Sequence, residues 1–83
     1  MYKRQGYRVQ IVISQNEQEL QDVKIEIEKL IDEQTYIIFE LPNYKLRVGN
    51  FLNRKEAESF QKKIVRLGYR TAWVVPTMIE KED

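Results

Sequence analysis

The sequence contains two similar halves offset by 37 residues, so that Tyr7 in the first half corresponds to Tyr44 in the second. The segment YRVQI at 7–11 returns as YKLRV at 44–48. The same offset then joins Asn16 and Asn53, Glu19 and Glu56, Val23 and Phe60, Ile27 and Ile64, Leu30 and Leu67, and Tyr36 and Trp73. Each half has a strand–helix–strand pattern, and neither half can bury its apolar face alone. The repeat therefore predicts one domain with the order β-α-β-β-α-β.

Residues 7–14 alternate in polarity, which is typical of a strand with one buried face. The alternation predicts that Val9, Ile11 and Ile13 face the core. It predicts the opposite face for the remaining side chains, which are Arg8, Gln10, Val12 and Ser14. Asn16 and Glu19 then have the spacing of a capping box. A helix is predicted after them from apolar residues at helical spacing: Leu20, Val23, Ile27, Leu30 and Ile31.

A hairpin is predicted in the middle of the chain. Residues 35–41 are rich in β-branched and aromatic side chains, Pro42 and Asn43 indicate a turn, and 44–51 form the next strand. Leu46 and Val48 should face the core, which leaves Lys45 and Arg47 on the opposite face.

The second half closes with a helix and a strand. Asn53 and Glu56 repeat the capping signature, and the apolar stripe of the helix is Ala57, Phe60, Ile64 and Leu67. Gly68 suits a left-handed helix stop. We expect the last strand at 70–75, with Pro76 ending its pairing, and a loose charged tail at 80–83.

These elements predict an α+β fold of the ferredoxin-like class, a β-α-β-β-α-β two-layer sandwich. Right-handed crossovers place both helices on one face of a four-stranded antiparallel sheet with the order 4-1-3-2. We expect a single domain over 1–83 with its core at 7–76.

Composition excludes several classes of function. The chain has a formal net charge of +1, no cysteine and no histidine, so it lacks a strong field for nucleic acid and the commonest metal ligands and general base. No glycine-rich phosphate loop exists, and no segment approaches the ~20 apolar residues of a membrane span. We therefore expect a protein that is not an enzyme and needs no cofactor or metal.

The sheet face without helices is the candidate site. Arg8, Gln10, Lys45 and Arg47 should lie at its centre, with Tyr36 and Trp73 at its flanks. Hydrogen-bond donors beside flat aromatic rings suit a sugar polymer or an extended anionic chain. The alternative is that the two aromatic residues are core or dimer-contact residues.

Two other functions share this architecture. An RNA-recognition module stacks bases on aromatic residues of its central strands, and the central strands here offer none on the open face. A ferredoxin-like dimerisation or protein-interaction domain would use the open sheet as an interface, with an apolar centre formed by Tyr36, Ile38, Trp73 and Val75. An oligomer formed through this face therefore stays open.

The second half resembles a SPOR domain, the sporulation-related repeat. The segment YKLRVGNF at 44–51 follows the family pattern Y-x-V-x-V-G-x-F, and NRKEAE at 53–58 and LGY at 67–69 follow its later motifs. The opening GYRVQI at 6–11 matches Y-x-V-Q-V. The resemblance covers residues 7–76. The family's Q-x-G-S-F reads QIVIS at 10–14, so that Val12 replaces the glycine.

The resemblance implies a peptidoglycan-binding module that holds glycan strands stripped of their stem peptides. It implies that the chain is part of a longer protein, which it directs to the cell wall or division site on the periplasmic side of a bacterial envelope. Family positions correspond to Gln10, Ile13 or Ser14, Asn43, Lys45 and Trp73. Combined with the open face, they give the predicted glycan-binding residues: Arg8, Gln10, Val12, Ser14, Tyr36, Asn43, Lys45, Arg47 and Trp73.

Overall fold

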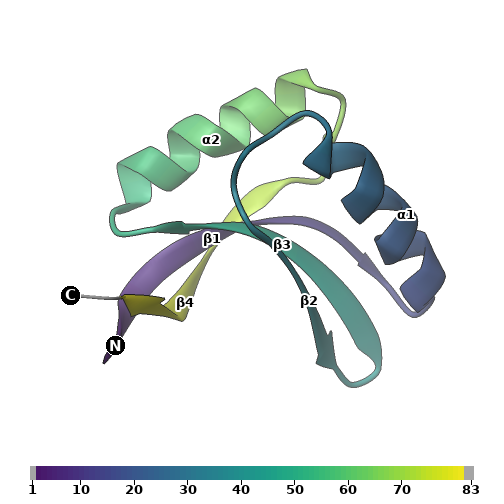
Figure 1. The fold of residues 1–83 in the computed structure, drawn as a ribbon, viewed down its shortest axis with the longest axis horizontal. Coiled ribbons are helices and arrows are strands. Elements are labelled where there is room, and N and C mark those ends of the chain that lie inside the picture. The colour runs from purple at the N-terminus through teal and green to yellow at the C-terminus, as the bar shows by residue number, and fades with distance from the viewer. Residues whose placement is uncertain (1, 82–83) are drawn as a thin grey trace.

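The computed structural model describes residues 2–81. Its strands and helices follow one another in the predicted β-α-β-β-α-β order (Figure 1). The elements are β1 (Tyr2–Ser14), α1 (Glu17–Glu28), β2 (Thr35–Glu40), β3 (Asn43–Phe51), α2 (Arg54–Arg66) and β4 (Trp73–Lys81). All neighbouring strands are antiparallel, and their order β2-β3-β1-β4 is the predicted 4-1-3-2 counted from the other edge. The fold class is confirmed, whereas the 37-residue sequence repeat stays a prediction. Neither helix is long and apolar enough to cross a membrane.

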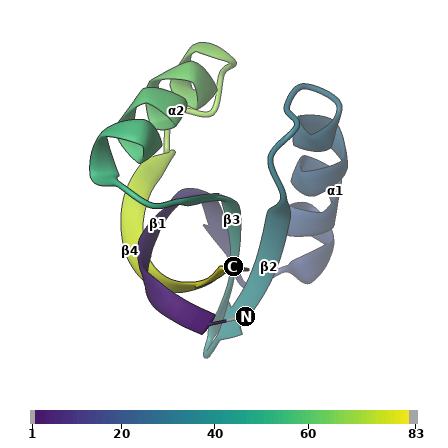
Figure 2. The same cartoon turned by 60° about the vertical axis from the view of Figure 1, so that its left-hand side comes forward.

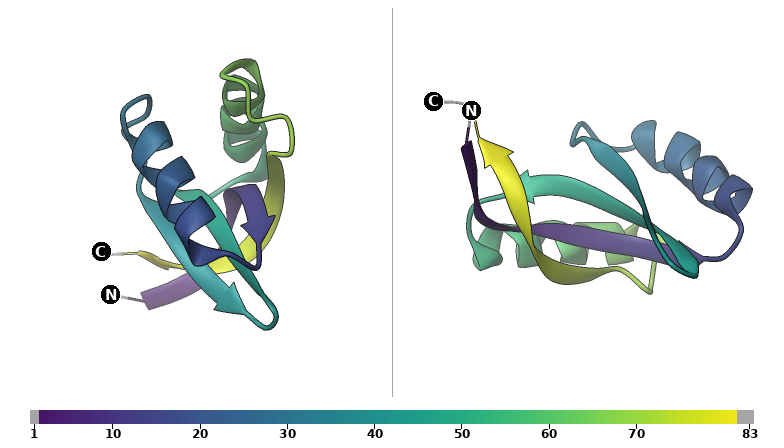
Figure 3. Two further views of the ribbon diagram at one scale, coloured as in Figure 1. Left: turned by 90° about the vertical axis from the view of Figure 1, so that its right-hand side faces the viewer. Right: turned by 90° about the horizontal axis from the view of Figure 1, so that it is seen from below.

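Both helices pack on one face of the sheet (Figures 1 and 3). The core between them consists of Val9, Ile11, Leu20, Ile27, Ile31, Leu46, Val48, Phe60, Ile64 and Ala72. At the start of α2, the Asn53 side chain accepts a hydrogen bond from the Glu56 backbone N–H at 2.9 Å, as in a capping box, and its amide group donates one to the Glu56 carboxylate. Asn16 caps α1 differently, because it accepts from the backbone N–H of Gln18. Leu30 lies beyond α1 and is exposed, so its place in the predicted stripe was wrong.

The helices are also joined to each other at one end. The Tyr69 hydroxyl, just after α2, donates a hydrogen bond to Glu26 in α1. Burial, and then this hydrogen bond, raise the pKa of Tyr69 to about 12, so the hydroxyl remains a donor at neutral pH. Gly68 ends the α2 turn with φ of 112°, the left-handed conformation predicted for it.

Strand β1 contains a bulge that changes which side chains face the core. Gln10 pairs with Arg47 and Val12 pairs with Leu46, so one residue of β1 has no counterpart in β3. After this point the alternation is reversed. Val12 packs against the core, whereas Ile13 is 48% exposed and pairs with Lys45. The predicted inward Ile13 and outward Val12 were therefore wrong.

Strand β4 begins later and ends later than predicted. It runs from Trp73 to Lys81 and continues through Pro76, which pairs with Tyr7. An edge strand tolerates proline because the N–H groups on its outer side have no partner strand. Glu80 and Lys81 belong to the strand, so the predicted loose tail was wrong for them, and residues 82–83 lie outside the described part of the chain.

The sheet is strongly curved. Beyond Phe51 the first half of β1 and the last half of β4 continue as a two-stranded ribbon, from the pair Gly6 and Thr77 to the pair Tyr2 and Lys81. This ribbon bends away from the helices, and the uncovered sheet face becomes the underside of an arch (Figures 1 and 2). Gly6 allows the bend to pack closely, since an added Cβ there would lie 2.6 Å from Ile79 Cδ1 and 2.9 Å from the Phe51 carbonyl oxygen.

The core assignment predicts which helix substitutions unfold the domain. Ile64 is fully buried in α2, so Ile64→Ala should lower the free energy of unfolding by about 2–5 kcal/mol. Ile27→Ala in α1 should do the same, because Ile27 is equally buried. Val65→Ala is the control in α2, since Val65 is 37% exposed and should change stability by about 0.5 kcal/mol or less. Urea denaturation gives these values, and equal losses for Ile64→Ala and Val65→Ala would contradict this core.

Candidate functional site

A row of four predicted site residues crosses the whole sheet on its uncovered face. Tyr36 of β2 pairs with Arg47 of β3, Arg47 pairs with Gln10 of β1, and Gln10 pairs with Trp73 of β4. Directly paired residues of antiparallel strands share a face, so these side chains are neighbours along the underside of the arch. We call these four residues the cross-sheet row.

The centre of the row is held by hydrogen bonds to charged groups. Arg47 Nε donates to Gln10 Oε1 at 3.0 Å, and a second Arg47 nitrogen lies 3.4 Å from the Glu40 carboxylate. Lys45 Nζ donates to the same Glu40 oxygen at 3.0 Å. Because a guanidinium only donates, its contact fixes the Gln10 amide with the oxygen toward Arg47 and leaves the N–H groups free to donate elsewhere. Asn43 begins β3 opposite Glu40, at the hairpin end of this group.

The row's Tyr36 end carries a second cluster. The Arg8 guanidinium lies 4.0 Å from the centre of the Tyr36 ring, and it donates to Asn50 Oδ1 at 3.0 and 3.2 Å. Asn50 in turn donates to the Tyr36 hydroxyl at 2.6 Å, and that hydroxyl contacts Gln34. One face of the Tyr36 ring is therefore already covered by Arg8, which makes Tyr36 a support for the guanidinium.

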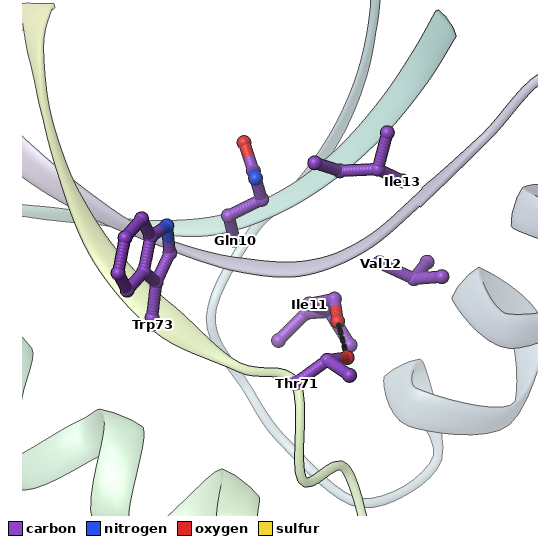
Figure 4. A pocket seen from close by; sticks show the side chains of 6 residues that line it. All are labelled: Gln10, Ile11, Val12, Ile13, Thr71 and Trp73. Atoms are coloured by element: carbon purple, nitrogen blue, oxygen red, sulfur yellow. Dashed lines mark hydrogen bonds between the residues drawn. The ribbon is translucent and has the colours of Figure 1, made fainter.

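The Trp73 end lies beside a cavity of about 380 Å³ (Figure 4). Strand β4 begins at Trp73, whereas β1 continues past Gln10 to Ser14, and the cavity occupies this step in the sheet. Its lining consists of Gln10, Ile11, Val12, Ile13, Thr71 and Trp73. Trp73 is 62% exposed, so its indole ring is available to a ligand. The Thr71 hydroxyl donates to the Ile11 carbonyl at 2.7 Å and satisfies the strand edge there.

Two predicted site residues do not join the others on the open face. Val12 packs against the core, although it also forms part of the cavity wall. The Ser14 hydroxyl donates to the Glu19 carboxylate at 2.9 Å and accepts the backbone N–H of Asn16 at 3.0 Å. Ser14 therefore stabilises the start of α1. The face predicted for both residues was wrong for the same reason, which is the bulge after Gln10.

Sequence reasoning missed three residues of the site, which are Glu40, Asn50 and Thr71. Glu40 follows Tyr36 and Ile38 in the same alternation, and that signal was sufficient to place it on the open face. Asn50 had no such signal, because β3 carries an extra residue near Gly49, whose φ is 85°. Thr71 borders the site because β4 starts only at Trp73. The resemblance gave Ile13 as one of two possible site positions, whereas alternation placed its side chain in the core, because alternation does not reveal the β1 bulge. In the described part of the chain, no acidic side chains cluster as a metal site would require.

The open face contains a carboxylate whose charge is maintained by its cationic neighbours. The hydrogen bond from Lys45 holds the pKa of Glu40 below its usual range, and the Coulombic attractions of Lys45 and Arg47 add to this effect. Since the pKa of Glu40 is lowered in the folded protein, these contacts persist at neutral pH and are lost as the pH falls through the lowered pKa. An incoming anion therefore competes with Glu40 for Lys45 and Arg47.

Known proteins match the chain at the level of a family and of a fold. The family model described as SPOR domain matches residues 3–76. A search of curated proteins finds no significant match. Among solved structures, the chain is similar to the solution structure of the peptidoglycan binding domain of the B. subtilis cell wall lytic enzyme CwlC, with a TM-score of 0.73, 14% identity and 96% coverage of both chains. At this identity the similarity shows the shared fold.

The contacts of Glu40 predict how its pKa responds to substitution. Lys45→Met should raise the pKa of Glu40, because it removes the main hydrogen bond that lowers it. Arg47→Met should raise that pKa less, since the guanidinium is farther away and contributes the weaker attraction. Carboxyl carbon shifts followed by NMR during a pH titration measure both effects. Glu28, whose carboxylate contacts Thr35 and Lys24 instead, is the internal control. A larger shift for Arg47→Met would contradict this order.

Proposed function

Because the chain belongs to the SPOR domain family, we propose that it is a non-catalytic module that binds the glycan strands of peptidoglycan on its open sheet face. The structural neighbour, by its title a peptidoglycan binding domain, supports this proposal. The observation that carries it is the cross-sheet row. An exposed indole, an oriented amide and a guanidinium lie in line across four strands, which suits a linear polymer of sugar rings.

Each residue of the site has a chemical role in this proposal. Trp73 is the platform for a pyranose ring, since its ring is exposed while the Tyr36 ring carries Arg8. Gln10, Asn43 and Arg47 supply hydrogen bonds to hydroxyl and amide groups. Arg8 and Lys45 supply positive charge at the two sides of the row. The hydrogen bonds among these residues exist without a ligand, so little ordering is needed on binding.

We propose further that the preferred glycan lacks stem peptides. Removing a stem peptide frees a lactyl carboxylate on the sugar, and the cations beside Glu40 are placed to attract such a group. A strand without peptides also fits more easily under the arch. In the cell this binding would hold the parent protein at the wall, on the periplasmic side of the envelope at sites of division.

Substitution of the indole tests the proposal. Trp73→Ala should weaken cosedimentation with insoluble peptidoglycan sacculi by roughly tenfold, which corresponds to about 1.4 kcal/mol. Its far-UV circular dichroism should be unchanged, because the side chain is exposed. Met78→Ala is the matched control, since Met78 is 53% exposed on the same strand but lies outside the site.

Amidase treatment of the sacculi tests the preference for strands without peptides. Binding of the unsubstituted domain should rise after treatment, and Trp73→Ala should lose most of that gain. Absence of binding to both forms of sacculi would overturn the proposed function. If Trp73→Ala then converted a dimer to a monomer in sedimentation velocity, the open face would be a protein interface instead.

A further inference from the structure

The cavity beside Trp73 has an unusual distribution of polar groups. Most of its wall is apolar and comes from Ile11, Val12, Ile13 and the Trp73 indole (Figure 4). Thr71 uses its hydroxyl hydrogen to bind the Ile11 carbonyl. The Gln10 oxygen is likewise occupied, because it accepts from Arg47. The donors that remain for a ligand are the Gln10 side-chain NH2 and the indole N–H of the exposed Trp73.

Among the described residues, this NH2 group has no hydrogen-bond acceptor, so a ligand can supply one. Gln10 is only 8% exposed, and among the described residues its amide nitrogen donates no hydrogen bond. No fully buried polar side-chain atom in that part of the chain lacks a partner, so this nitrogen must reach solvent. Gln10 lines the cavity and lies on the open face of the sheet, so a ligand seated there can reach its NH2 group. A donor in such poor contact with water gains more than an exposed one when a ligand carbonyl replaces the water.

We propose that this cavity is a pocket for the acetamido group of one N-acetylhexosamine, which makes N-acetylation a condition for binding. The inference rests on the proposed function and adds the chemical group that is read. The acetamido carbonyl accepts from Gln10, the methyl group packs against Ile13, and the pyranose ring lies on Trp73. A pocket of this volume is at the lower end of the range for small ligands, which suits one sugar residue.

Other groups fit the same wall less well. A free amino sugar carries an ammonium, which would be desolvated by the apolar wall and repelled by Arg47, the cation bound to Gln10 at 3.0 Å. A plain hexose has neither the carbonyl for Gln10 nor the methyl group for Ile13. From this pocket the cross-sheet row continues through Arg47 to Tyr36, so neighbouring sugars of the same strand would follow it.

The methyl group can be tested without changing charge. Amidase-treated sacculi are de-N-acetylated and then re-acylated in two batches, one with acetyl and one with formyl groups. Both batches carry neutral amides with the same carbonyl, and they differ by one methyl group per sugar. The domain should bind the N-formyl batch about three- to fivefold more weakly, as expected for burial of one carbon.

Two variants place the effect in the pocket. Ile13→Ala should bring the ratio of N-acetyl to N-formyl affinity close to one, because the wall that contacts the methyl group is removed. Ile13 is 48% exposed, so this change should leave the fold intact, which thermal denaturation checks. Met78→Ala, outside the pocket, should keep the ratio of the unsubstituted domain.

The outcomes separate this inference from the proposed function. If the unsubstituted domain binds neither untreated nor amidase-treated sacculi, the proposed function fails and the inference fails with it. If it binds sacculi and binds both re-acylated batches equally, the glycan function stands and the acetamido pocket is overturned. An unchanged ratio in Ile13→Ala would also overturn it.

Discussion

The register between the two central strands is the constraint on which the rest of the molecule depends. Strands β1 and β3 carry the core on one face and the candidate site on the other. The pair Val9 and Val48 lies on the core face, and the pair Gln10 and Arg47 lies on the face of the candidate site. A shift of β3 by one residue would turn the Arg47 guanidinium toward the core and expose Val48. The free energy of packing in the core therefore also holds the polar groups of the site in line.

Much of this arrangement could be predicted from the sequence, because alternation of apolar and polar residues in a strand indicates which side chains face the core. It placed Gln10, Lys45 and Arg47 correctly, and the repeat placed Tyr36 and Trp73 on the same face. It failed wherever a residue was added to one strand only. The extra residue in β1 displaced Val12 and Ser14 from the face predicted for them. A bulge depends on the pairing of two distant segments, and alternation within one segment does not report it.

The charges of the open face are balanced by contacts within the protein. Glu40 accepts from Lys45 and Arg47, while Asn50 and Tyr36 hold Arg8. Such contacts keep long cationic side chains in place, and each one limits the charge available to a partner. The internal contacts therefore leave this face with little free positive charge to attract a polyanion. This agrees with a chain whose formal net charge is only +1.

The ribbon formed by the ends of β1 and β4 has a mechanical consequence. Tyr2 pairs with Lys81, so the two ends of the described chain leave from the same point. A force that pulls these ends apart would break the residue pairs of the ribbon one after another, so the two strands should separate at low force. A force between the C-terminal end and a ligand bound at Gln10 would instead slide β4 along β1 and load the backbone hydrogen bonds of their paired residues together. The same domain would thus be weak to separation of its ends and strong as a tether.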